Sequence, residues 1–229
     1  MDFLAVLRTE LTTFGGLITP DADLAAPVPT CGDWTFYDLV DHMGQGNLWV
    51  VTAVAENRGD FQGPPAPKDA TDLRAWYDET ADAILESLSA APETPAWTFT
   101  RLLPRNVAFW RRRRAQETLM HRWDAQNALG TPQPFDPALA DDGITEIFEM
   151  FAQRMIDRGL ATAPATALRV RSTDTDRTWT YGPGDAVTEI SATASDLLLA
   201  LWQRIPTSAL TWEGDRPAGE KVLAGPLVP

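Results

Sequence analysis

The sequence predicts an α+β protein in which a helical N-terminal domain, residues 1–162, is followed by a smaller C-terminal α/β domain, residues 163–229. Two patterns and the chain length support this prediction. Apolar residues recur at spacings of three and four through the first part, as in amphipathic helices. Beyond Pro164 they fall in short alternating stretches bounded by Asp, Gly or Pro, as in strands. A length of 229 residues suits one principal domain with a smaller companion.

Five helices are expected in the first domain, separated by loops rich in Pro or Gly. The first carries an apolar stripe from Phe3 to Phe14. The second should begin near Thr35, which stands three residues before Asp38 as in a capping box, and should continue through His42. The other three are expected at about residues 71–90, 107–129 and 137–159.

Short strands and one helix are expected in the second domain. The alternating stretches predict strands at residues 168–170, 179–181 and 187–190, a helix at 194–204 and one more possible strand at 210–212. A change from helical to strand periodicity near residue 162 sets the expected domain boundary.

Composition restricts the partners. The net charge of −13 disfavours nucleic acid and anionic membrane surfaces, which leaves a small molecule as the expected partner. No apolar run approaches the roughly 20 residues that span a bilayer, and charges interrupt the first residues, so we expect a cytoplasmic chain. The single cysteine excludes an internal disulfide and a thiolate metal cluster within this chain. Nine Trp residues suit a core or the walls of a ligand pocket.

Three residues form a candidate metal site. Glu117 and His121 are four residues apart, so their side chains lie one turn apart on the same helix face. His42, on another helix, could supply a third ligand, and the fourth position of a tetrahedral zinc ion would stay open, as in catalytic sites. The alternative is a helix-surface pair beside a core histidine, and spacing alone favours that alternative.

Three segments resemble one family. Residues 34–42 read WTFYDLVDH and resemble the start of the second helix in the mycothiol-dependent maleylpyruvate isomerase family, a branch of the DinB-like metalloproteins. Residues 114–125 look like its E-x-x-x-H-R-x-D-A helix, and residues 197–204 are similar to a helix near the end of its C-terminal domain. The resemblance implies a DinB-like four-helix bundle, a smaller α/β domain and a divalent metal on His42, Glu117 and His121.

The resemblance also implies a reaction. The family's founding activity uses mycothiol, the low-molecular-weight thiol of actinobacteria, to isomerise maleylpyruvate to fumarylpyruvate. A divalent cation stabilises a thiolate at neutral pH. Addition of that thiolate to a cis double bond leaves a rotatable single bond, and elimination after rotation releases the trans isomer. If elimination is blocked, the same site is an S-transferase.

Other residues are expected to support the site. Arg114 shares the face of Glu117 and could clamp a substrate carboxylate, although an ion pair with an acidic residue is an equal alternative. Asp124 could accept the non-ligating N–H of His121, with a salt bridge as its alternative. Gln45 and Trp49 are expected in the cofactor pocket. The resemblance suggests that the C-terminal domain contributes an arginine, for which Arg204 is the first choice; the alternatives are Arg169, Arg171 and Arg177.

Several questions stay open at this point. The enzyme hypothesis competes with a metal-containing binding protein, or a metal-water enzyme of the same fold, that does not use mycothiol. Zinc is the expected ion, with nickel and manganese as alternatives, because availability as well as ligand type decides the occupant. The electrophile and the choice between monomer and homodimer are undetermined by the sequence.

Overall fold

The computed structural model describes residues 1–229 and divides into two compact units, Met1–Gln133 and Pro134–Pro229. The expected α+β class is confirmed, with helices in the first unit and a four-stranded sheet in the second. The sequence predicts the domain boundary near residue 162, whereas the structure divides after residue 133. The reason is that helix α5 (Pro137–Glu146) packs on α7 (Ala194–Leu201), so it belongs to the second unit although its periodicity is helical.

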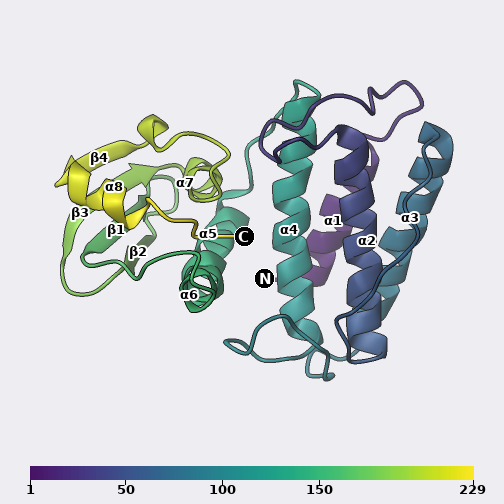
Figure 1. Ribbon diagram of the computed structural model, residues 1–229, viewed down its shortest axis with the longest axis horizontal. Helices are drawn as coiled ribbons and strands as arrows, with labels where there is room; N and C mark the ends of the chain where they lie inside the picture. The colour runs from purple at the N-terminus through teal and green to yellow at the C-terminus, as the bar shows by residue number, and fades with distance from the viewer. The chain divides into compact units, whose positions relative to one another are not determined.

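The first unit is a four-helix bundle. Its helices are α1 (Phe3–Gly15), α2 (Phe36–Ala55), α3 (Ala70–Ser87) and α4 (Val107–Ala128). They lie side by side, and contacts run from α1 to α4, α4 to α2, α2 to α3 and α3 back to α1 (Figure 1). The four-helix bundle implied by the family resemblance is therefore confirmed.

Local sequence signals set the starts of the two helices that carry the candidate site. At α2, the backbone N–H of Asp38 donates to Thr35 Oγ1 and the N–H of Thr35 donates to Asp38 Oδ2, so the predicted capping box is formed. At α4, the Asn106 side chain accepts the N–H of Phe109. Each helix thus begins at a defined residue. That residue sets the position of every later side chain along the helix axis.

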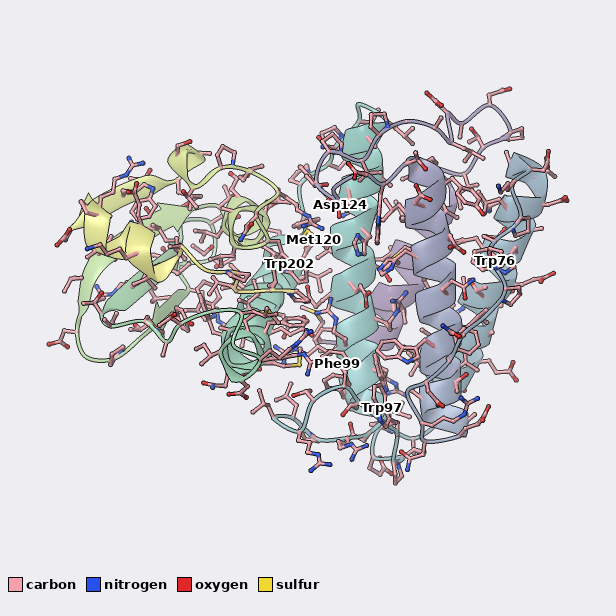
Figure 2. All side chains as sticks on the ribbon, in the orientation of Figure 1. Trp76, Trp97, Phe99, Met120, Asp124 and Trp202 are labelled. Carbon is pink, nitrogen blue, oxygen red and sulfur yellow. The ribbon has the colours of Figure 1, made fainter.

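Close packing around α2 depends on glycine and aromatic residues. A Cβ at Gly44 would lie 2.2 Å from the Trp76 ring of α3, so glycine permits the approach of these two helices. Trp49 packs edge-on against Trp97 and Trp110 near the N-terminal end of α4, where Figure 2 labels Trp97. Trp110 is fully buried in the bundle core, whereas Trp49 and Trp97 are half-buried.

Helix α4 is buried on nearly every side, including its polar residues. Its fully or almost fully buried polar side chains are Arg113, Arg114, Gln116, Thr118, His121, Arg122, Asp124 and Gln126. Buried charges are costly unless they are paired. The charges of this helix therefore need partners, and the candidate site supplies several of them.

The second unit combines helices with a mixed sheet. α5 continues through a π-helical turn (Ile147–Phe151) into α6 (Ala152–Asp157), and the strands are β1 (Ala167–Ser172), β2 (Thr178–Tyr181), β3 (Ala186–Ala192) and β4 (Thr211–Gly214). The strand order is β2-β1-β3-β4, with β1 and β3 parallel and the outer pairs antiparallel. All four strands lie where the sequence predicts them.

One helix of the second unit was not predicted. Helix α8 (Arg216–Val222) follows β4 and is capped by the Asp215 side chain, which accepts the N–H of Ala218. It contains Gly219, whose added Cβ would lie 2.7 Å from Thr188 of β3. Glycine weakens the helical pattern in the sequence but allows this close packing on the sheet.

No helix of the chain combines the length and apolarity that a membrane crossing requires.

Candidate metal centre

The bundle brings the three predicted ligands together. His42 extends from the second turn of α2, and Glu117 and His121 lie one turn apart on α4. His42 Nε2 is 3.6 Å from Glu117 Oε1, and the two imidazole rings have centroids 5.1 Å apart. One ligand atom from each of the three residues lies within 4.8 Å of the others. The sequence periodicity does not show whether α2 and α4 are neighbours. The tertiary structure places them side by side.

The donor set fits a divalent ion. Two ligands of a tetrahedral zinc ion, each at a bond length of about 2.1 Å, are separated by roughly 3.4 Å, close to the distance between His42 and Glu117. Two imidazoles and one carboxylate are a ligand set typical of catalytic zinc. The side chain of His42 is 38% exposed and that of Glu117 is 24% exposed, so the site is partly open to solvent. His42, Glu117 and His121 could therefore hold an ion with an open position.

Glu117 is kept ionised by cations on its own helix. Burial raises the pKa of its carboxyl, but Arg114, the His42 hydrogen bond and Arg113 together hold that pKa well below its usual range. Arg114 Nη1 lies 3.0 Å from Glu117 Oε2, and Arg113 Nε lies 3.8 Å from the same oxygen. The carboxylate is thus available as an anionic ligand and is fixed in position.

Arg114 is buried and bonded to protein groups. Its side chain is 1% exposed, and its Nη2 donates to Asn47 Oδ1 at 2.7 Å and to the Met43 carbonyl at 3.3 Å. The ion-pair alternative is therefore formed, because the guanidinium contacts protein groups of α2 and Glu117; a contact of Arg114 with substrate stays a prediction. A Cβ at Gly46 would lie 2.7 Å from Arg114 Nη1, so glycine at 46 makes room for this arginine.

Asp124 contacts the second histidine as the sequence suggests. Its Oδ2 lies 3.0 Å from His121 Nδ1, and because a carboxylate only accepts, Nδ1 is the donor; in the neutral ring Nε2 then keeps its lone pair. Burial lowers the pKa of His121, while Asp124 opposes that effect. Figure 2 labels Asp124 near the C-terminal end of α4.

The loop before α2 supports Asp124. Thr30 Oγ1 donates to Asp124 Oδ1 at 2.6 Å, and Cys31 Sγ lies 3.5 Å from Asp124 Oδ2. Four residues later, the Trp34 ring packs against His42 with centroids 4.8 Å apart. One loop therefore contacts the surroundings of both histidines. Sequence reasoning missed the roles of Thr30 and Trp34, because a loop residue carries no periodicity that shows what it contacts.

A pocket of about 660 Å³ opens beside the candidate ligands. Its lining residues come from α2, from Glu117 and from the segment before α3: Asp41, His42, Gln45, Gly46, Trp49, Gly59, Phe61, Gln62, Gly63, Pro65 and Glu117. Gln45 and Trp49 thus line this pocket, and their part in binding a cofactor stays a prediction. The volume is in the range of small-molecule sites.

Residues 59–66, which we call the strap, form one wall of this pocket and are tied to α2. Four side chains spaced one turn apart along α2 make the ties. Tyr37 donates to the Ala66 carbonyl at 2.7 Å, Asp41 accepts the Ala66 N–H at 3.0 Å, Gln45 donates to the Pro64 carbonyl at 2.5 Å and Trp49 donates to the Gly59 carbonyl at 2.9 Å. This four-residue stripe of hydrogen-bonding side chains is visible in the sequence, but its partners are not.

The arginines proposed from the C-terminal domain have contacts within their own unit. Arg204 Nη1 donates to the Trp202 carbonyl at 3.1 Å. Arg171 donates to Glu189 at 2.7 Å, Arg169 lies 3.7 Å from the same carboxylate and Arg177 lies over the Trp179 ring. Contribution of any of them to the metal centre stays a prediction.

Two family models match the chain. The mycothiol maleylpyruvate isomerase N-terminal domain matches residues 4–126, and the MDMPI C-terminal domain matches residues 138–221. The gap between the two matches includes the division between the two compact units after Gln133.

Curated relatives are uncharacterized proteins of Mycobacterium tuberculosis. One, from strain H37Rv, is 32% identical over 124 residues, which cover 51% of this chain and 60% of the relative. Another from the same strain is 25% identical over 229 residues and covers 91% of this chain and 87% of the relative. The match to the first relative therefore spans less than two thirds of its length.

Two solved structures share the fold. A crystal structure of the mycothiol-dependent maleylpyruvate isomerase aligns with a TM-score of 0.69 at 12% identity and covers 94% of both chains. A histidine-to-alanine mutant of that isomerase aligns with a TM-score of 0.67 at 13% identity and the same coverage. At this identity the likeness establishes the fold.

Proposed function

The chain belongs to the mycothiol maleylpyruvate isomerase family, and from this premise we propose that it is a metal-dependent enzyme with mycothiol as thiol cosubstrate. The reaction is cis–trans isomerisation of a small electrophile such as maleylpyruvate, or S-conjugation to such an electrophile. One observation carries the proposal: His42, Glu117 and His121 converge within 4.8 Å, and two of them line an open pocket.

His42, Glu117 and His121 would hold the ion, for which the ligand set favours zinc. When bound, a divalent cation supplies positive charge that lowers the pKa of a thiol and stabilises its thiolate at neutral pH. Arg114 acts as a positioning residue, because it holds Glu117 ionised and oriented toward His42. Asp124 keeps the proton on His121 Nδ1 and so directs the other ring nitrogen toward the ligand position.

The pocket would receive the thiol cosubstrate and the electrophile. Gln45 and Trp49 line it next to His42, which supports their role in cosubstrate binding. Trp34 packs on His42 and restricts rotation of its ring. For an electrophile that carries a carboxylate, we propose that Arg204 supplies the compensating charge, and Arg204→Ala should then raise KM for that electrophile more than it changes metal content.

Metal content tests the first half of the proposal. Wild-type protein should bind one equivalent of zinc, measured by elemental analysis after gel filtration. His42→Ala should lose most of it, because two remaining ligands bind an ion weakly. Asp82→Asn changes an exposed residue on α3 and is the control for losses during purification. It should bind as much zinc as the wild type. Full metal content in His42→Ala contradicts the three-ligand site.

Thiol dependence tests the second half. Cobalt-substituted protein should change its absorption spectrum when mycothiol is added, because the thiol would bind beside an ion held by His42, Glu117 and His121. An unchanged spectrum at saturating mycothiol overturns the thiol mechanism. It would leave a metal-containing binding protein or a metal-water enzyme of the same fold as the better description.

A further inference from the structure

A buried chain of hydrogen bonds runs inward from the candidate metal centre across three helices. Arg114 of α4, which pairs with Glu117, donates from Nη2 to Asn47 Oδ1 of α2 at 2.7 Å. Asn47 Nδ2 donates in turn to Thr80 Oγ1 of α3 at 3.2 Å, and Thr80 Oγ1 donates to the Tyr77 carbonyl at 2.8 Å. Helix α2 packs against both α4 and α3, so the chain crosses the interior of the bundle (Figure 1).

The direction of this chain is fixed at its inner end. The Tyr77 carbonyl only accepts, so the Thr80 hydroxyl uses its single proton there and offers its lone pairs to the next group. The amide of Asn47 must then turn its N–H side to Thr80 and its oxygen to Arg114. Thr80 therefore orients the Asn47 amide so that it presents the acceptor which a guanidinium requires.

Asn47 in turn fixes the plane of the Arg114 guanidinium. Two groups accept from Nη2, namely Asn47 Oδ1 at 2.7 Å and the Met43 carbonyl at the longer distance of 3.3 Å, whereas Nε has no hydrogen-bond partner. Because the guanidinium is planar, the direction of Nη2 also sets that of Nη1, which lies 3.0 Å from Glu117 Oε2. The side chain of Asn47 thus determines where Arg114 places its charge relative to Glu117.

A simpler explanation is that these bonds only satisfy buried polar groups. Arg114, Asn47 and Thr80 are all at most 2% exposed, and buried polar groups without partners destabilise a protein. The chain does more than this, because it continues without interruption to Glu117, whose other oxygen, Oε1, lies 3.6 Å from His42. It therefore links α3, which supplies none of the three candidate ligands, to one of those ligands.

We propose that Asn47 and Thr80 are positioning residues for the metal centre: they orient Arg114, and Arg114 then holds Glu117 in the conformation that binds the ion. The inference rests on the proposed function, because it requires Glu117 to be a ligand. Neither residue lines the pocket beside the ligands or hydrogen-bonds to a ligand. Their effect on the ion therefore passes through Arg114.

Zinc affinity of the full chain, measured by competition with a chromophoric chelator, tests the proposal. Asn47→Leu removes the acceptor and should weaken zinc binding about tenfold, the lower end of the range for residues that orient metal ligands. Thr80→Val leaves the amide without its orienting hydroxyl and should weaken binding about threefold, whereas Thr80→Ser should restore the wild-type affinity. Thr52→Val is the matched control and should bind zinc as the wild type does, because Thr52 is also buried but donates to the Leu48 carbonyl of its own helix.

The Glu117→Gln background separates positioning from a general loosening of the bundle. This variant lacks the carboxylate that Arg114 holds, so adding Asn47→Leu should weaken zinc binding by less than about twofold. An equal loss of affinity in both backgrounds would assign Asn47 to stability alone and overturn the inference. Urea unfolding of the metal-free proteins verifies that each variant is folded under the conditions of the assay. If Asn47→Leu does not fold, Thr80→Val and its rescue by Thr80→Ser decide the question.

The absorption spectrum of cobalt-substituted protein supplies an independent measurement. At saturating cobalt, Asn47→Leu and Thr80→Val should shift the ligand-field bands, because the Glu117 carboxylate is then oriented differently, and Thr52→Val should keep the wild-type spectrum. Zinc binding by the wild type, with unchanged affinity and spectra in Asn47→Leu and Thr80→Val, would overturn the inference and leave the proposed function standing. If the wild-type protein binds no zinc, both are wrong.

Discussion

The two helices that form the metal centre present their side chains in different ways. On α4, Glu117 and His121 are each contacted by a buried charged residue, Arg114 and Asp124 respectively. On α2, His42 is 38% exposed and rests on the ring of Trp34. The neighbouring Asp41 and Gln45 are hydrogen-bonded to each other and line the pocket.

This difference separates two tasks. Buried charges on α4 fix the geometry of the ligands, because removal of one partner from a buried charge pair strongly destabilises the folded protein. The α2 face and the strap can change without such a penalty, since their groups are partly solvated. We expect the buried charges of α4 to hold two of the three ligands in place, and the exposed face of α2 with the strap to determine which molecule binds beside the site. Four predictions test this comparison.

Glu117→Ala should cause the largest loss of stability. It leaves the buried Arg114 without its carboxylate, at a cost of about 3 kcal/mol in the metal-free protein. His42→Ala removes a half-exposed ring and should cost much less. Urea unfolding of both metal-free variants measures the two losses. Similar losses of stability in the two variants would mean that the ligands on α4 contribute no more to stability than the ligand on α2.

Asp124→Asn should weaken zinc binding by about 10- to 100-fold, because it removes the carboxylate that fixes the tautomer of His121. Competition with a chromophoric chelator measures the affinity. Asp38→Asn is the matched control, since Asp38 stands one turn before His42 but serves the capping box. An equal loss of zinc affinity in the two variants would show that Asp124 has no specific effect on His121.

Thr30→Val should have a smaller effect on the same affinity, about fivefold, because it removes one hydrogen bond of about 1 kcal/mol to Asp124. Thr30→Ser retains the hydroxyl and should restore the wild-type value. If Val and Ser behave alike, the loop before α2 does not orient Asp124.

Tyr37→Phe should change global stability least, by less than about 1 kcal/mol, because three other ties still join the strap to α2. Its expected effect is local: amide hydrogen exchange of the strap should speed up while that of α4 stays unchanged. Faster exchange throughout the bundle would mean that the strap is part of the cooperative core.

Most of the fold is predictable from local patterns. The capping box of Thr35 and Asp38, the stripe of α1 and the alternation of β1 to β3 are short-range signals, and the corresponding elements lie where those signals place them. The domain boundary is different, because the helix starting at Pro137 has the same periodicity as the bundle helices. Which unit it joins depends on its contact with α7, far along the chain.

The candidate site divides in the same way. Sequence by itself determines that Glu117 and His121 share a helix face and that Tyr37, Asp41, Gln45 and Trp49 form a stripe, because helical geometry fixes side chains four residues apart. Only the tertiary structure decides that His42 meets Glu117, that Thr30 reaches Asp124, and that Arg114, which shares α4 with Glu117, is held beside it by groups of α2. These partners are selected by packing and charge compensation in the interior rather than by any local pattern.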